Sequence, residues 1–235
     1  MRKLFVTLSG AALLLMSCNS EVKKGNTFIS GEIQGLKQGT LYIQQVKDSS
    51  LVVLDSMVLK GNSSFESSFD LEEPEVLYLG LNRGTSQSVD NLILFFAEPG
   101  NLTINSSLDN FSGGAVIEGS ENQKLYDNYL EMRSSITNRQ NELIKDYLLA
   151  QKNQQNIKAD SLEQAIQRAG RSYYFNAVNF ALKNNQAEVA PYIALTDVVP
   201  IHNRHLDTIY GNLPLEIAQS KYGIVLGEYL ELIKE

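Results

Sequence analysis

The sequence predicts an α+β protein in which an N-terminal antiparallel β-sandwich or partly open barrel precedes an all-helical segment. Two observations predict this fold class. Residues 28–118 alternate apolar and polar side chains in short runs between turns rich in Gly, Asn and Pro, which is typical of half-buried antiparallel strands. From Gly119 onward, apolar residues recur at spacings of three and four, which is typical of helices.

About eight strands are expected, and they share apolar positions at every second residue. They lie near residues 28–33, 40–46, 51–60, 64–69, 76–81, 92–97, 102–106 and 115–118. The run 92–97 is apolar at both parities, so we expect it to form a central strand with both faces covered. Short strands at such regular intervals indicate a sandwich or a partly open barrel.

The C-terminal part should begin with a long antiparallel helix hairpin. Ser120 followed by Gln123 is a capping-box pattern, so the first helix should start there. Residues 151–158 are a polar break, after which a second helix is expected to begin at Asp160 or Ser161. Further helices are expected at residues 187–197, 202–210 and 217–233.

The first residues resemble the export signal of a bacterial lipoprotein. A charged start at Arg2 and Lys3 precedes the apolar run 4–16, and residues 15–18 (Leu-Met-Ser-Cys) follow the lipobox pattern. The resemblance implies cleavage before Cys18, the one cysteine of the chain, and lipidation of its thiol and its new amino group. The alternative is a plain signal peptide with an incidental cysteine. Several acyl chains, at ~0.8 kcal/mol per buried methylene, would anchor the protein stably.

These features divide the chain into four parts. We expect a lipoprotein signal peptide at 1–17, a lipidated tether at 18–27, a sandwich-like domain at 28–118 and a helical domain at 119–235. The expected location is the bacterial cell envelope, with the lipid in the inner or the outer membrane. Loss of Arg2 and Lys3 with the leader takes the basic residues from 20 to 18 against 27 acidic ones, a net charge of −9. Such a surface argues against a nucleic-acid partner.

Several residues suggest a site, but each also has a structural interpretation, which we favour. His202 and His205 share a helix face, as a metal site requires, yet no metal motif includes them, so we expect solvated side chains and no metal. Asp55 lies in an apolar stripe and is either a ligand contact or a residue that a β-bulge turns outward or into a turn-capping role. The helical tyrosines either line a binding face or pack in the core: Tyr126, Tyr129, Tyr147, Tyr173 and Tyr174.

The motifs of common enzyme classes are missing from the sequence. It contains no Gly-x-Ser-x-Gly elbow, no phosphate loop and no dinucleotide-binding fingerprint. We therefore expect a protein that is not an enzyme, with no catalytic residue and no cofactor. A hydrolase with a site assembled from scattered Asp, Glu and His side chains is the alternative.

Several motifs, in this order, resemble the N-terminal region of envelope thiol-disulfide oxidoreductases of the TlpA/ResA type. They include residues 29–35 (Ile-Ser-Gly-Glu-Ile-Gln-Gly), 98–104 (Glu-Pro-Gly-Asn-Leu-Thr-Ile), 117–122 (Ile-Glu-Gly-Ser-Glu-Asn) and 221–223 (Lys-Tyr-Gly). In those lipoproteins, a β-rich domain of unknown function and a helical segment precede a thioredoxin domain with a Cys-x-x-Cys pair. This sequence has no such pair, and thiol-disulfide exchange requires a thiolate. The resemblance therefore implies the accessory part of that architecture without the catalytic part.

The sequence thus predicts a membrane-anchored envelope lipoprotein with a non-catalytic binding or scaffold role. Its expected partners are the membrane, through the lipid on Cys18, and either an envelope protein or a second copy of the chain. The alternative is a component of an envelope thiol-disulfide redox system that acts with a separate thioredoxin-fold partner.

Overall fold

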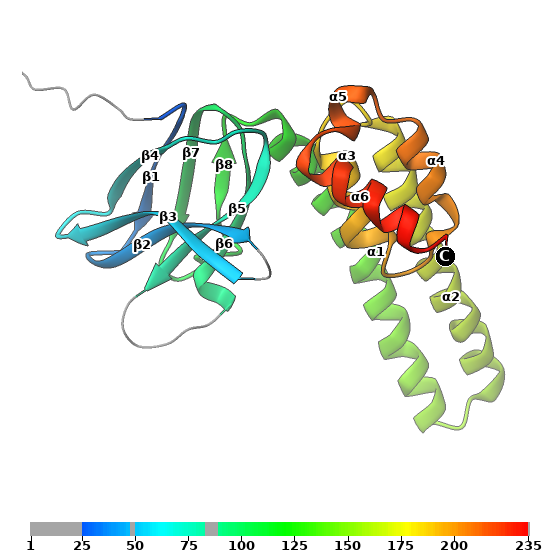
Figure 1. The fold of residues 1–235 in the computed structure, drawn as a ribbon. Coiled ribbons are helices and arrows are strands. Elements are labelled where there is room, and N and C mark those ends of the chain that lie inside the picture. Colours follow the sequence, from blue (N-terminus) through cyan, green and yellow to red (C-terminus); the bar gives the residue numbers. More distant parts are fainter. Residues whose placement is uncertain (1–24, 48–49, 83–88, 235) are drawn as a thin grey trace, which may run out of the picture.

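The computed structural model describes residues 25–47, 50–82 and 89–234, and it shows a β-sandwich followed by a helical segment (Figure 1). The predicted signal peptide, Cys18 and the first part of the predicted tether lie outside the described residues. The last part of that tether belongs to the fold. Thr27 is fully buried, and the side chain of Asn26 forms hydrogen bonds with the backbone N–H and carbonyl of Leu71.

Eight strands form two four-stranded sheets, with the orders β4-β1-β7-β8 and β3-β2-β5-β6. The sheets do not close into a barrel, so the sandwich is the form that this chain adopts. The strands are β1 (Thr27–Gln34), β2 (Gln38–Lys47), β3 (Ser50–Lys60), β4 (Ser64–Phe69), β5 (Glu75–Asn82), β6 (Leu92–Ala97), β7 (Gly100–Ser107) and β8 (Val116–Glu118), with a short 3-10 helix η1 (Val89–Asn91) before β6. One pairing departs from the antiparallel prediction, because β1 and β7 run parallel.

Alternating apolar side chains explain why these segments form strands. At every second position the side chain points between the sheets and is almost completely buried, as in Ile29, Ile33, Leu41, Ile43, Leu77, Leu79, Phe95, Leu102 and Ile104. Burial of a side chain of this size stabilises the fold by about 1.5–3 kcal/mol. The period-two pattern therefore fixes which face of each strand is inside.

The prediction of a central strand at residues 92–97 is wrong in position, although both faces are covered. β6 stands at the end of its sheet, beside β5. Phe95 packs between the sheets, whereas Phe96 packs in a second core made with the helices. The helices cover the outer face of β6, which explains why the sequence is apolar on both faces of a strand that stands at the end of its sheet.

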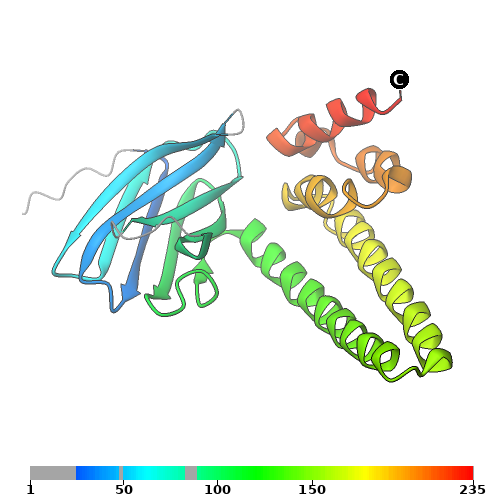
Figure 2. The same ribbon diagram turned by 90° about the horizontal axis from the view of Figure 1, so that it is seen from below.

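The predicted helix hairpin is confirmed, and it projects away from the sandwich while the shorter helices gather at its base (Figure 1, Figure 2). The second helix begins at Asn156, earlier than the predicted Asp160 or Ser161. The helices are α1 (Glu121–Lys152), α2 (Asn156–Lys183), α3 (Val189–Ile193), the π-helix η2 (Ala194–Val198), the 3-10 helix η3 (Asn203–His205), α4 (Leu206–Gly211), α5 (Leu215–Ala218) and α6 (Lys221–Leu232). None of the helices in the described part of the chain has the length and apolarity that a membrane span requires.

The last predicted helix, 217–233, is in fact two helices. Ser220 interrupts it and caps α6 by accepting a hydrogen bond from the N–H of Gly223. Gly223 packs against α5, where a Cβ atom would lie 2.0 Å from the carbonyl oxygen of Ile217. Gly223, which would weaken a continuous helix, is therefore required here, because only a residue without a side chain fits the close turn between α5 and α6.

Candidate functional site

A cluster of aromatic rings joins the sheet to the helices. Phe96 of β6 meets Tyr126 of α1, Tyr192 of α3 and Tyr222 of α6. The closest pair, Tyr192 and Tyr222, has ring centroids 5.1 Å apart, and the contacts are edge-to-face. Aromatic pairs of this geometry contribute about 0.5–1.5 kcal/mol each beyond their buried area. Four elements distant in the sequence thus share one packing centre, which we call the aromatic junction.

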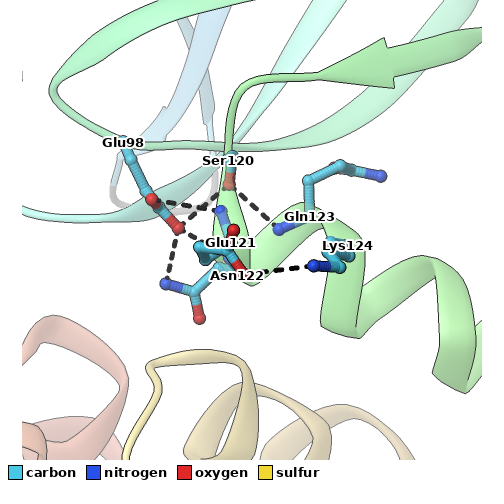
Figure 3. A network of polar contacts seen from close by, with 6 residues as sticks. All are labelled: Glu98, Ser120, Glu121, Asn122, Gln123 and Lys124. Atoms are coloured by element: carbon cyan, nitrogen blue, oxygen red, sulfur yellow. Dashed lines mark hydrogen bonds and ion pairs between the residues drawn. The ribbon is translucent and has the colours of Figure 1, made fainter.

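Glu98, in the turn between β6 and β7, binds the start of α1 (Figure 3). One of its carboxylate oxygens accepts hydrogen bonds from the Ser120 hydroxyl at 3.0 Å, from the Asn122 N–H at 2.7 Å and from the Asn122 side-chain amide at 2.9 Å. The other oxygen accepts from the Glu121 N–H at 3.3 Å. A carboxylate at this position also interacts favourably with the dipole of α1. Glu98 therefore fixes where the helix begins relative to the sandwich.

Asn122 extends this network to α3. Its amide nitrogen donates to the Glu188 carboxylate at 2.7 Å, and its amide oxygen accepts from the Val189 N–H at 2.8 Å. The side chain is buried, so its polar atoms depend on these partners. One asparagine thus connects the β6–β7 turn, α1 and α3.

The capping-box prediction at Ser120 is right in one half only. The Ser120 hydroxyl accepts a hydrogen bond from the Gln123 N–H at 2.9 Å, as expected. The Gln123 side chain, however, accepts from the Phe96 N–H at 2.7 Å instead of returning to Ser120. It thereby satisfies a backbone donor of β6, the end strand of its sheet, and shields that edge.

The N-terminus of α6 is bound to β5 and to the residues before it. The Val76 N–H donates to the Tyr222 hydroxyl at 2.7 Å, and the Lys221 N–H donates to the Glu73 carboxylate at 2.7 Å. The Lys221 ammonium group pairs with Glu75, which is 4% exposed and also accepts from the side chain of Gln45. Because loss of either partner would leave a poorly solvated charge, these bonds hold α6 in one position on the sheet.

These contacts border a groove of about 610 Å³ between the sandwich and α6. Its lining comes from the end of the β2–β3 hairpin (Gln45, Val46, Lys47 and Leu54), from the segment leading into β5 (Asp70, Leu71, Glu72, Glu73 and Glu75) and from α6 (Lys221 and Val225). Two more open hollows, at residues 117–128 and 154–161, are each lined by a single stretch of chain. The groove is therefore our candidate site, because three separate parts of the chain converge on it.

The rim of the groove exposes apolar side chains. The pairing of β2 with β5 stops at Gln45 opposite Leu77, so the end of the β2–β3 hairpin extends beyond the sheet. Val46 and Val225 belong to the lining of the groove and are 44% and 45% exposed, and Leu51, Val52 and Val53, on the strand paired with β2 beside it, are between 41% and 48% exposed. Isolated exposed apolar residues are ordinary, whereas grouped ones beside a groove mark interaction sites.

The two histidines lie away from this groove. Nδ1 of His202 accepts the Arg204 N–H at 2.9 Å, and both histidine rings lie beside Tyr174. Neither therefore needs a metal to explain its position. Over the described ranges, no three His, Cys, Asp or Glu side chains are placed to hold a metal ion together.

A β-bulge lies next to Asp55, as the favoured interpretation predicted, but it does not turn the side chain outward, because Asp55 pairs with the buried Ile43 and is itself half-buried. Ile43 pairs with Asp55 but Gln44 pairs with Val53, so one extra residue of β3 separates the two pairs. The Asp55 carboxylate accepts the Ser67 hydroxyl at 2.6 Å. Asp55 therefore connects β3 to β4 across the edges of the two sheets.

The helical tyrosines pack mainly in the core. Tyr126, Tyr129 and Tyr174 are buried, whereas Tyr147 and Tyr173 are half-buried with hydroxyls bonded to neighbouring side chains. Tyr173 donates to Asp197 of the π-helix η2, which also pairs with Arg133 at 3.4 Å. These tyrosines therefore stabilise the helices, as predicted, and lie outside the groove.

Sequence reasoning missed the residues that line the groove. Two signals were present, namely the acidic segment at residues 70–75 and the loss of strict alternation in Leu51, Val52 and Val53. The resemblance motifs also contain Glu98, Asn122 and Lys221. Their contacts join residues far apart in the chain, which a local pattern does not reveal.

Part of the chain matches a family model. Residues 28–126 match the family model described as a domain of unknown function (DUF4369). This span contains most of β1, the other strands and the start of α1. Neither a curated protein nor a solved structure matches the chain. The strand part is thus similar to a family whose activity is unknown.

We expect Asn122→Ala to lower the free energy of unfolding by about 2–4 kcal/mol, because it removes three hydrogen bonds and leaves the buried Val189 N–H without this acceptor. Urea unfolding measures the change. Asn128→Ala, at an exposed position of α1, is the matched control and should stay within about 0.5 kcal/mol of the parent protein. Equal effects of the two substitutions would contradict the assigned role of Asn122.

The aromatic junction should make the fold sensitive to alkaline pH. Burial raises the pKa of Tyr126, Tyr192 and Tyr222 above the ordinary value of about 10. Because the folded pKa exceeds the unfolded one, their stabilisation is complete below pH ~10 and is lost as the pH rises further. We expect Tyr192→Phe to reduce this loss by up to about 1.4 kcal/mol per pH unit in urea unfolding between pH 9 and 11. An unchanged slope in the variant would count against the assignment.

Proposed function

We propose that the protein is a membrane-anchored cell-envelope lipoprotein whose folded part binds a partner and catalyses no reaction. The observation that carries the binding role is the groove beside α6, to which three separate parts of the chain contribute and whose rim exposes apolar side chains. Support for the anchor comes from the sequence alone, through the lipobox-like residues that end at Cys18. The groove supplies a recognition surface, and the lipid would keep it at the membrane.

The construction of the groove supports binding because its walls are held in place before a partner arrives. Glu73 and Glu75 bond to Lys221, and Tyr222 bonds to the backbone of Val76. A preorganised surface loses less conformational entropy on association, so more of the contact energy appears as affinity. The apolar rim then supplies contact area, and the charged walls supply selectivity.

A second candidate is a role in an envelope thiol-disulfide redox system, beside a separate thioredoxin-fold partner. The motifs that resemble TlpA/ResA-type proteins include Tyr222 of the aromatic junction and three residues that form polar contacts between the sandwich and the helices, namely Glu98, Asn122 and Lys221. This correspondence favours a shared way of joining strands to helices. In this variant of the proposal, the thioredoxin-fold partner carries out the redox chemistry, and the present protein holds that partner in position.

Site-specific photo-crosslinking in the bacterium that makes the protein tests the binding role. A photoreactive amino acid would replace Val46 or Val225 at the groove, or Val116, a comparably exposed valine of β8, as the matched control. We expect a discrete adduct from both groove positions and none from Val116. Thioredoxin-fold adducts would select the redox variant, whereas equal labelling at all three positions, or none at the groove, would refute the binding site.

The anchor is tested separately by cell fractionation. We expect the parent protein in the membrane fraction and Cys18→Ser in the soluble fraction, because the substitution removes the thiol that would carry lipid. Mass spectrometry of the N-terminal peptide identifies the modification directly. Recovery of an unmodified Cys18, or of the uncleaved leader, would contradict the lipoprotein assignment and leave the groove unaffected.

A further inference from the structure

We infer that the groove takes an extended polypeptide segment in which aliphatic and basic residues alternate, and that this segment adds as a further strand to β3. The inference rests on the proposed function, since it takes the groove as the binding site and names the class of partner. Three properties of the site lead to it: an open strand edge, an acidic wall and exposed apolar side chains.

The first half of β3 is an open edge. β3 ends its sheet, with β2 beside it, so its other side has no hydrogen-bonded strand among the described residues. Toward its C-terminal end β3 approaches β4, and Asp55 bonds to Ser67 there. Residues 50–54 lie beyond this contact, where the hairpin extends past the sheet. Their outward N–H and carbonyl groups can pair with another chain.

This edge lacks most of the usual protections against pairing, and the β-bulge at Leu54 stands only at its end. Natural proteins protect open edges with charged residues, proline, bulges or covering elements. The end strand β6 has a covering element, because the Gln123 side chain of α1 accepts a hydrogen bond from the backbone N–H of Phe96. Residues 50–54 read Ser-Leu-Val-Val-Leu, with neither a charge nor a proline, and Leu51, Val52 and Val53 are exposed. A strong β-forming sequence at an open edge suits the addition of a strand.

The wall of the groove determines the charge of the partner. Asp70, Glu72, Glu73 and Glu75 line one side, against Lys47 and Lys221 on the others. Lys221 is already paired with Glu75, and Glu72 is exposed. The remaining carboxylates complement lysine or arginine side chains, and they disfavour a second copy of this acidic chain, which would bring an identical wall.

Strand geometry then determines the pattern of the partner. Successive side chains of an added strand point to opposite faces of the sheet. One set can therefore reach the carboxylates of the groove, while the other packs on the exposed side chains of the hairpin, such as Leu51 and Val53. Basic and aliphatic residues must accordingly alternate, and the same residues in blocks would not satisfy both faces.

Fluorescence anisotropy with synthetic peptides tests this inference on the purified chain. The probe is a fluorescein-labelled peptide of about eight residues that alternates Lys and Val. The controls are a Lys-block–Val-block peptide of the same composition, a Glu–Val alternating peptide, and the Lys–Val peptide N-methylated at alternate backbone nitrogens. We expect the probe to bind at least about tenfold more tightly than each control. Equal affinity of the alternating and block peptides would overturn the inference.

Two protein variants and one further measurement locate the bound probe. Glu72→Lys should weaken binding of the probe about fivefold or more, whereas Glu163→Lys, at another exposed acid, on α2, should leave it unchanged. Hydrogen–deuterium exchange should slow in residues 50–54 when the probe binds and stay unchanged at the tip of the α1–α2 hairpin. Protection elsewhere, or equal effects of the two variants, would refute strand addition at β3.

The remaining outcomes separate this inference from the proposed function. Sedimentation velocity of the chain alone should show a monomer, and a dimer abolished by Val52→Lys would assign the β3 edge to a second copy and overturn the inference. Groove-specific crosslinks in cells together with no binding of the alternating peptide would keep the groove as a binding site and reject its strand-like partner. Absence of both would reject the proposed function itself.

Discussion

The packing of Phe96 against three tyrosines is the constraint on which the rest of the structure depends. This ring points away from the sandwich core, so β6 needs a second apolar cover, and Tyr126, Tyr192 and Tyr222 provide it. Because those tyrosines belong to α1, α3 and α6, one residue of a strand fixes three helices. The position of α6 beside β5, and with it the groove, follows from that packing.

Polar contacts around the aromatic junction fix the orientation of the helices that pack on the sheet. Hydrophobic burial is non-directional and would tolerate several placements of the helices. Hydrogen bonds that Glu98 accepts from Asn122 fix the start of α1, and the contacts of Glu73 and Glu75 with Lys221 fix the start of α6. Each of these side chains would be costly to bury without its partner, so alternative orientations are disfavoured. A groove built in this way keeps its shape without a ligand.

The sequence predicted what local periodicity determines. Period two located the strands, and the change at Gly119 located the helix hairpin, because both depend on neighbouring residues. The apolar pattern on both faces of the strand at 92–97 showed that both faces are covered. It did not show whether the strand lies at the centre of the sheet or at its end beneath the helices. The groove was not predictable either, since Val76 and Tyr222 are 146 positions apart when they bond. The anchor at Cys18 remains a sequence prediction.

The distance between the sandwich and α6 tests the fixed junction most directly. In a Cys18→Ser background, spin labels at cysteines replacing Val58 of β3 and Leu232 of α6, both exposed, report that distance by double electron–electron resonance. The matched pair, Val58 and Val116, reports the rigidity of the sandwich itself. The account predicts a single distance distribution for the first pair, as narrow as that for the second. A broad or double distribution for the first pair, beside a narrow one for the second, would contradict it.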